Sequence, residues 1–120
     1  MRVQLEGQAL RLRIKEAELE RLLGGETLRN ETRWPDGSVT CQQVALAKDH
    51  GWERLDDGWR VLLAERPVRE LVKRLPGKEG LNLELPVPNG KSLELLFDVD
   101  TRDSARRLLK RRRSSAKDES

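Results

Sequence analysis

The chain has 120 residues, the length of one ordinary domain, and a formal net charge of +3. Hydrophobic residues make up 36% of it and charged residues 38%, so a core can form beneath a heavily charged surface. No apolar run reaches the roughly 18 residues of a membrane-spanning helix, and the alternating start is unlike a signal peptide. Because Cys41 is the single cysteine and cannot form an internal disulfide, we expect a cytoplasmic protein without a membrane span.

Positive charge is concentrated at the end of the chain. Residues 101–120 hold eight Lys and Arg against three Asp and Glu, a net charge of +5, whereas residues 1–100 hold 16 against 18, a net charge of −2. We therefore expect one nearly neutral domain over residues 1–100 and a basic helical tail over residues 101–120 with a disordered end. Six tail cations lie within eight residues: Arg106, Arg107, Lys110, Arg111, Arg112 and Arg113.

The first 46 residues contain two pairs of alternating polar and apolar stretches around one helical stripe. Alternation with period two predicts strands, and apolar residues three and four apart predict a short amphipathic helix that ends at Gly24-Gly25. Pro35-Asp36-Gly37 is a strong turn signal. The expected elements are strands at 2–6 and 10–14, a helix at 15–23, and strands at 27–34 and 38–46.

Residues 52–100 show the same order of patterns. Pro67 suits the first turn of a helix, where its missing N–H is tolerated, and Pro76-Gly77 ends the stripe. Asn89-Gly90 is the best two-residue hairpin signal in the chain. The expected elements are strands at 52–55 and 59–64, a helix at 67–75, strands at 81–85 and 93–97, and a last helix capped by Asp100 or Thr101.

The order strand–strand–helix–strand–strand thus occurs twice. The turn at Asp36-Gly37 recurs at Asn89-Gly90, 53 positions later. This self-similarity favours an internal duplication over a pattern that any two hairpin–helix–hairpin segments would share. We expect an α+β fold of mostly antiparallel hairpins, which is barrel-like or two-layered. Its half-repeats lie at about 1–46 and 52–99 and are related by a pseudo-two-fold axis. A monomer of this kind would be a pseudo-dimer. Seven residues recur 49 positions later: Arg11, Leu12, Ile14, Glu16, Leu19, Leu22 and Leu23 as Arg60, Val61, Leu63, Glu65, Val68, Leu71 and Val72.

Two family resemblances follow from these residues. The stretch from Gly7 to Glu16, then Leu22-Leu23-Gly24 and Asp36-Gly37, resembles AbrB/MazE-type swapped-hairpin modules, and the second half resembles them more weakly. Such modules are dimers of short chains that bind DNA as transcription regulators or antitoxins, so the resemblance implies DNA binding. The chain is also similar to a small family of uncharacterised bacterial proteins over most of residues 1–100. The corresponding stretches are residues 7–14, which match well, and residues 98–101, and that resemblance implies no activity.

The candidate nucleic-acid-binding residues are cations on one strand and in the tail. Arg11, Arg13 and Lys15 lie on one face of a predicted strand, and Arg2 is expected near them across the hairpin. They suit phosphate, although a solvated strand face that discourages edge pairing is the plain alternative. Three roles fit the tail cations: binding of nucleic acid with release of condensed counterions, contact with an anionic membrane surface, or solubility alone. We therefore expect a non-enzymatic nucleic-acid-binding module.

The alternative is a protein–protein interaction or structural accessory module. Trp34 stands beside Pro35 at the tip of a predicted hairpin, where an exposed indole suits an aromatic anchor for a protein partner. The surface decides between the two hypotheses: a continuous positive stripe favours nucleic acid, and scattered charges with one apolar patch favour a protein. The oligomeric state stays open at this point.

No motif of a catalytic, metal or cofactor site is present. We expect His50 to lie in a solvated loop and Cys41 to be a small buried residue on the apolar side of its strand. Asp98 and Asp100 share a strand face and are expected to cap the next helix rather than to bind Mg²⁺. The least favoured hypothesis is a hydrolase of phosphorylated compounds, whose candidate residues would converge inside a barrel: Glu16, Glu94, Asp98 and Arg13.

Overall fold

The computed structural model describes residues 1–77 and 79–102, and these form an α+β fold of two four-stranded sheets and two helices. The expected tail helix and its cations at 106–113 lie outside the described residues. Within the described part no helix is long and apolar enough to cross a bilayer. The elements are β1 (Arg2–Glu6), β2 (Ala9–Lys15), α1 (Glu16–Leu23), β3 (Leu28–Arg33), β4 (Val39–Ala47), β5 (Gly51–Leu55), β6 (Gly58–Ala64), α2 (Glu65–Lys73), β7 (Leu81–Pro86) and β8 (Ser92–Asp100).

Each sheet joins two hairpins that come from opposite halves of the chain. The first, sheet A, has the order β1-β2-β8-β7, and the second, sheet B, has the order β3-β4-β6-β5. The hairpins are antiparallel as expected, but the central pairs β2–β8 and β4–β6 are parallel, so both sheets are mixed rather than antiparallel throughout. The expectation missed these pairs because local alternation predicts a strand without naming its partner.

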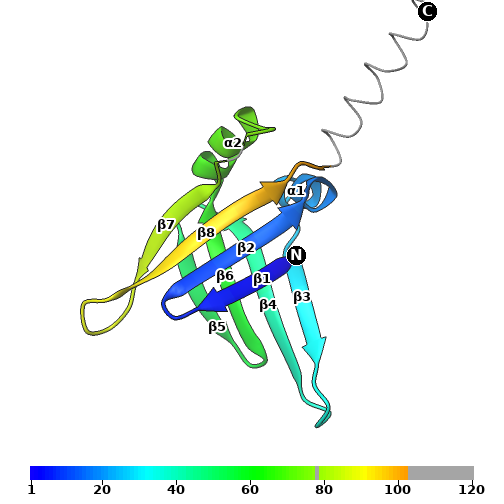
Figure 1. Cartoon of the computed structure of the whole chain (residues 1–120), viewed down its shortest axis with the longest axis vertical. Coiled ribbons are helices and arrows are strands. Elements are labelled where there is room, and N and C mark those ends of the chain that lie inside the picture. Colours follow the sequence, from blue (N-terminus) through cyan, green and yellow to red (C-terminus); the bar gives the residue numbers. More distant parts are fainter. Residues whose placement is uncertain (78, 103–120) are drawn as a thin grey trace, which may run out of the picture.

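The apolar core lies between the two sheets and is closed at one end by the helices. Figure 1 shows sheet A crossing in front of sheet B, with α1 and α2 together at one end and the β3–β4 and β7–β8 hairpins projecting away from it. Leu19 and Leu22 of α1 and Val68 and Leu71 of α2 are buried in the same core. The remaining core residues are Leu10, Leu12, Ile14, Leu28, Val44, Val61, Leu63, Leu85, Leu95, Phe97 and Val99.

Corresponding elements of the two halves are separated by constant offsets. β1, β2 and the start of α1 recur 49 positions later as β5, β6 and the start of α2, and β3 and β4 recur 53 positions later as β7 and β8. Replacing each strand by its counterpart turns the order of sheet A into that of sheet B. The register follows the same rule, because the pair Leu12–Phe97 corresponds to the pair Val61–Val44.

Two details of the expected elements need correction. Helix α2 begins at Glu65, directly after β6, so that Pro67 occupies its third position rather than its first. The alternation of β4 places Val44 in the core and Cys41 on the opposite face of sheet B. Cys41 is buried as expected, but it lies outside the apolar core.

Candidate functional site

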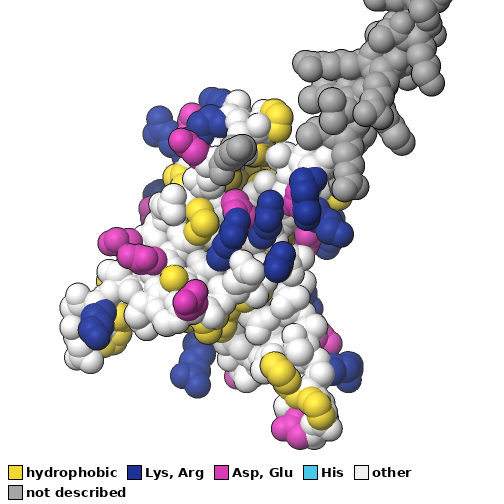
Figure 2. Space-filling view, in the orientation of Figure 1, with side chains coloured by type: hydrophobic (Ala, Val, Ile, Leu, Met, Phe, Trp, Pro, Cys, Tyr) yellow, Lys and Arg dark blue, Asp and Glu magenta, His cyan; other side chains and the backbone are white. Residues whose placement is uncertain are grey.

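The outer face of sheet A carries the strand cations that the sequence singled out. Leu10, Leu12 and Ile14 of β2 enter the core, so the alternating residues Arg11, Arg13 and Lys15 face outward. The register sets Arg2 of β1 opposite Arg13, on the same face. In Figure 2, Lys and Arg side chains gather in a row over this part of sheet A. The structure therefore brings all four predicted strand cations together.

Asp98 of β8 lies among these cations. It pairs in register with Arg13, and its Oδ2 accepts hydrogen bonds from Arg11 Nε at 3.2 Å and from Arg11 Nη2 at 2.7 Å. Its other oxygen, Oδ1, lies 3.7 Å from Arg13 Nε, an ion pair without a hydrogen bond. The Asp98 side chain is only 15% exposed, whereas Arg11 is 43% and Arg13 33% exposed. The carboxylate is thus covered while both guanidinium groups reach solvent.

Asp100 behaves differently from Asp98. Its Oδ1 accepts the backbone N–H of Arg102 at 3.0 Å, and its carboxylate also pairs with the Arg102 side chain. The helix that Asp100 is expected to cap lies outside the described residues. The hydrogen bonds from Arg102 hold the pKa of Asp100 well below its usual value. Of the two aspartates, only Asp98 pairs with the cations of β2 in the described structure.

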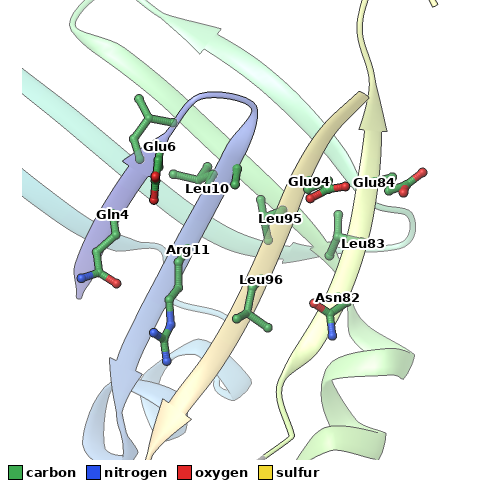
Figure 3. A pocket seen from close by; sticks show the side chains of 12 residues that line it. Gln4, Glu6, Leu10, Arg11, Asn82, Leu83, Glu84, Glu94, Leu95 and Leu96 are labelled. Carbon is green, nitrogen blue, oxygen red and sulfur yellow. The ribbon is translucent and has the colours of Figure 1, made fainter. Parts of the chain in front are cut away.

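The same outer face becomes acidic toward its other end. Gln4, Arg11, Leu96 and Asn82 form one row across the four strands, at the floor of a shallow depression (Figure 3). The next row away from Asp98 carries the carboxylates of the face. These are Glu6, Glu94 and Glu84.

The equivalent surface of sheet B lacks this cluster. Arg11 has a counterpart in Arg60, which pairs with Glu53 at 2.7 Å and donates to Gln43 at 3.0 Å. The counterparts of the other charged residues are all apolar. Arg2, Arg13, Lys15, Asp98 and Asp100 correspond to Gly51, Leu62, Ala64, Ala45 and Ala47. Because both sheets share one strand plan, the fold itself does not require the charges of sheet A.

Trp34 lies just beyond β3 and is 49% exposed, as expected for a residue at this hairpin tip. Its indole Nε1 donates to Thr40 Oγ1 at 3.0 Å, so the ring is held in place by the opposite strand. The sequence did not indicate a second aromatic feature, the stack of Trp52 on Trp59 with ring centroids 4.8 Å apart. The register explains the stack, because the pairing of β5 with β6 sets Trp52 opposite Val61 and therefore diagonally across from Trp59 on the same face.

His50 lies in a loop, as expected, but it is not fully solvated. It is half-buried, and its Nδ1 accepts the backbone N–H of Ala64 at 2.9 Å, at the point where α2 begins. In the first half the corresponding N–H, that of Lys15, is accepted by Glu18 at 3.0 Å. Pro67 stands at the position that corresponds to Glu18, so the second helix takes its acceptor from the preceding loop instead. The contact gives His50 a structural role.

The residues of the hydrolase hypothesis do not meet in one enclosed cavity. Glu94 is exposed and lines the shallow depression, whereas Arg13 and Asp98 pair with each other elsewhere on the face and Glu16 begins α1. No group of His, Cys, Asp and Glu residues suited to a metal ion occurs among the described residues. No family model and no curated protein matches the chain.

Proposed function

We propose that the chain is a non-enzymatic module that binds the phosphate backbone of a nucleic acid through the basic end of sheet A. We define this basic end by Arg2, Arg11, Arg13 and Lys15. The observation that carries the proposal is the difference between the two sheets. They share one strand plan, yet Arg2, Arg13 and Lys15 of sheet A have no cationic counterpart on sheet B, and side chains that folding does not require are candidates for binding.

The charge balance of the basic end supports this function. Three carboxylates lie near its four cations: Asp98, Asp100, which is already engaged by Arg102, and Glu18, which is already engaged by the Met1 amino group. Neither Arg2 nor Lys15 forms a side-chain ion pair with a described residue. Free cations on one surface bind nucleic acid largely by releasing the counterions condensed on phosphate. The acidic row lies next to the row of Arg11, and the row of Arg11 separates it from Arg2, Arg13 and Lys15, so these three cations can contact phosphate away from the carboxylates of the acidic row.

We also propose that the two halves arose by duplication of a unit like those of the AbrB/MazE-type modules. The constant offsets of 49 and 53 residues and the matching registers support this origin. A duplicated chain would achieve as a monomer what two short chains achieve as a dimer. In a duplicated chain the two sheets have separate sequences, so the outer face of one sheet can become charged while the other does not. This view fits a cytoplasmic regulator, with the basic tail at 106–113 as an additional contact to nucleic acid.

A binding titration with a short fluorescein-labelled DNA duplex tests the proposal, read by fluorescence anisotropy. We expect full-length protein to bind at about 50 mM salt and to lose about threefold in affinity per phosphate contact at about 200 mM salt. The triple substitution Arg2→Gln, Arg13→Gln, Lys15→Gln should weaken binding and flatten the salt dependence. The matched control replaces cations elsewhere, Arg33→Gln with Arg54→Gln, and should bind as the unsubstituted protein. Absence of binding at about 50 mM salt would rule out the proposal.

The contribution of the tail is measured separately. Substituting Arg111, Arg112 and Arg113 with Gln removes three tail cations and leaves sheet A intact. If the tail supplements the basic end, this variant should bind more weakly and the combined variant more weakly still. An unchanged affinity would assign the tail to solubility.

The second candidate function, docking of a protein partner on Trp34, is favoured by one observation. An indole that is 49% exposed while its Nε1 is hydrogen-bonded to Thr40 offers a fixed apolar surface, which is typical of an interface anchor. Trp34→Ala distinguishes the two functions, because it should leave DNA affinity unchanged if nucleic acid binds at sheet A.

A further inference from the structure

We infer that Asp98 is a positioning residue, which holds Arg11 and Arg13 as a two-arginine clamp for one phosphate group of the nucleic acid. The inference rests on the proposed function and goes beyond it. The proposed function needs only positive charge on sheet A. The clamp needs a particular arrangement of two guanidinium groups, maintained by a carboxylate that a simple charge argument would count as unfavourable for phosphate.

The contact between Arg11 and Asp98 fixes one edge of the Arg11 guanidinium. Nε and Nη2 both donate to Oδ2, at 3.2 and 2.7 Å, which leaves Nη1 and the outer side of the fork free of hydrogen bonds to described residues. Paired N–H groups in this fork geometry match the oxygens of a phosphate. The Asp98 side chain is 15% exposed and that of Arg11 is 43% exposed, so the arginine is the more accessible member of the pair.

Arg13 is held by charge and keeps its hydrogen-bonding capacity. Its Nε is buried and lies 3.7 Å from Asp98 Oδ1, and neither of these two atoms has a hydrogen-bond partner in the described structure. No nitrogen of Arg13 donates to a described residue, although its side chain is 33% exposed. A buried polar cluster that is only partly satisfied is a candidate for a ligand contact. Arg13 therefore has a partly exposed side chain whose nitrogens form no hydrogen bond to the described residues.

The position of Asp98 also counters repulsion among the cations. Arg13 lies directly opposite Arg2 on β1, and like charges at opposite positions of paired strands repel. Asp98 is the register partner of Arg13 on the other side, so it attracts the guanidinium toward β8. Side chains that are ordered before binding lose less conformational entropy when the ligand arrives. Asp98 thus lowers the net positive charge of the face but orders the arginine side chains before phosphate binds.

The test asks whether the substitution Asp98→Asn strengthens or weakens DNA binding. Charge alone predicts tighter DNA binding when a carboxylate is neutralised, whereas the clamp predicts weaker binding, by about fivefold, because the charge-assisted bond to Arg11 is lost. Asp98→Glu, which retains the carboxylate, should recover part of the affinity. The matched control is Glu53→Gln, which breaks the Arg60–Glu53 ion pair of the same 2.7 Å length on sheet B and should not weaken binding.

Arg11→Lys gives an independent measurement if Asp98→Asn does not fold. It retains the charge, so counterion release predicts unchanged affinity and salt dependence, whereas a fork that holds phosphate predicts a loss of about fivefold. Weaker binding in Asp98→Asn, with an unaltered thermal midpoint, supports the clamp; where Asp98→Asn does not fold, weaker binding in Arg11→Lys supports it. Unchanged or tighter binding in folded Asp98→Asn, or unchanged binding in Arg11→Lys, overturns the clamp and leaves the proposed function intact. Failure of the unsubstituted protein to bind overturns the proposed function itself.

Discussion

Arg11 and Asp98 are 87 positions apart in the chain, yet Arg11 Nη2 lies 2.7 Å from Asp98 Oδ2. The contact exists because β2, near the start of the chain, pairs in parallel with β8, near the end of the domain. Any change that loosens this pairing therefore affects both the core and the candidate binding face. The consequences for stability can be tested residue by residue.

Leu22 and its counterpart Leu71 should contribute similarly to stability. Both are buried in the same core, one on each helix, with 0% and 1% exposed surface. Leu22→Ala and Leu71→Ala should each lower the free energy of unfolding by roughly 2–5 kcal/mol, because each removes apolar contacts and leaves a cavity. Urea denaturation measures the effect, with Arg33→Ala on the exposed face of β3 as the neutral control. A large effect at only one of the two positions would contradict the proposed equivalence of the halves.

Gly58 should not tolerate a side chain. A Cβ at this position would overlap the backbone carbonyl of Cys41, its register partner on β4. Gly58→Ala should therefore destabilise the protein by about 1–3 kcal/mol through displacement of β6 from β4. The control is Gly51→Ala, whose Cβ would lie at an ordinary 3.5 Å from Leu62 Cδ1. Thermal unfolding of the two variants should differ clearly, and equal midpoints would refute the close approach.

His50 should stabilise the start of α2. Its Nδ1 accepts the N–H of Ala64, a buried residue, and without His50 that donor would lose its partner. His50→Ala should lower the free energy of unfolding by about 1 kcal/mol, as expected for an unpaired buried donor. His50→Asn, which keeps an acceptor, should be less harmful. Protection of the Ala64 amide from hydrogen exchange reports on the contact directly, and unchanged protection in His50→Ala would show that the bond is not needed.

Glu18 should make stability depend on pH in the acid range. Burial raises the pKa of its carboxyl, but hydrogen bonds from the Met1 amino group and the Lys15 N–H outweigh burial and bring the pKa below its usual value of 4.5. A lowered pKa in the folded state means that ionised Glu18 stabilises the fold. This stabilisation is complete above about pH 4.5 and disappears as the pH falls through the folded-state pKa.

The measurement for Glu18 is denaturation of the unsubstituted protein and of Glu18→Gln across this range. The gap in unfolding free energy should be constant near neutral pH and shrink as the pH falls below 4.5 and through the folded-state pKa, where Glu18 becomes protonated. Glu31→Gln, on an exposed strand position, should show a smaller gap throughout. If the difference in unfolding free energy between the unsubstituted protein and Glu18→Gln widened on acidification, the conclusion that ionised Glu18 stabilises the fold would be wrong.

The sequence by itself determined the elements and their order. Period-two alternation marked the eight strands of the described domain, apolar residues three and four apart marked both helices, and Asp36-Gly37 and Asn89-Gly90 marked the hairpin turns. It also placed Arg11, Arg13 and Lys15 on one face and Arg2 beside them. These inferences hold because side-chain direction within a strand and the register of a short hairpin depend on residues close together in the chain.

Only the tertiary structure decided which hairpins share a sheet. The parallel pairs β2–β8 and β4–β6 join segments from opposite halves, and no local pattern encodes such a partner. Asp98 was accordingly read as a helix cap, and its contact with Arg11 was not foreseen. His50 was read as solvated because its acceptor role depends on how the loop before β5 meets the start of α2. Contacts between distant segments depend on how the buried faces pack together, and local periodicity does not record that packing.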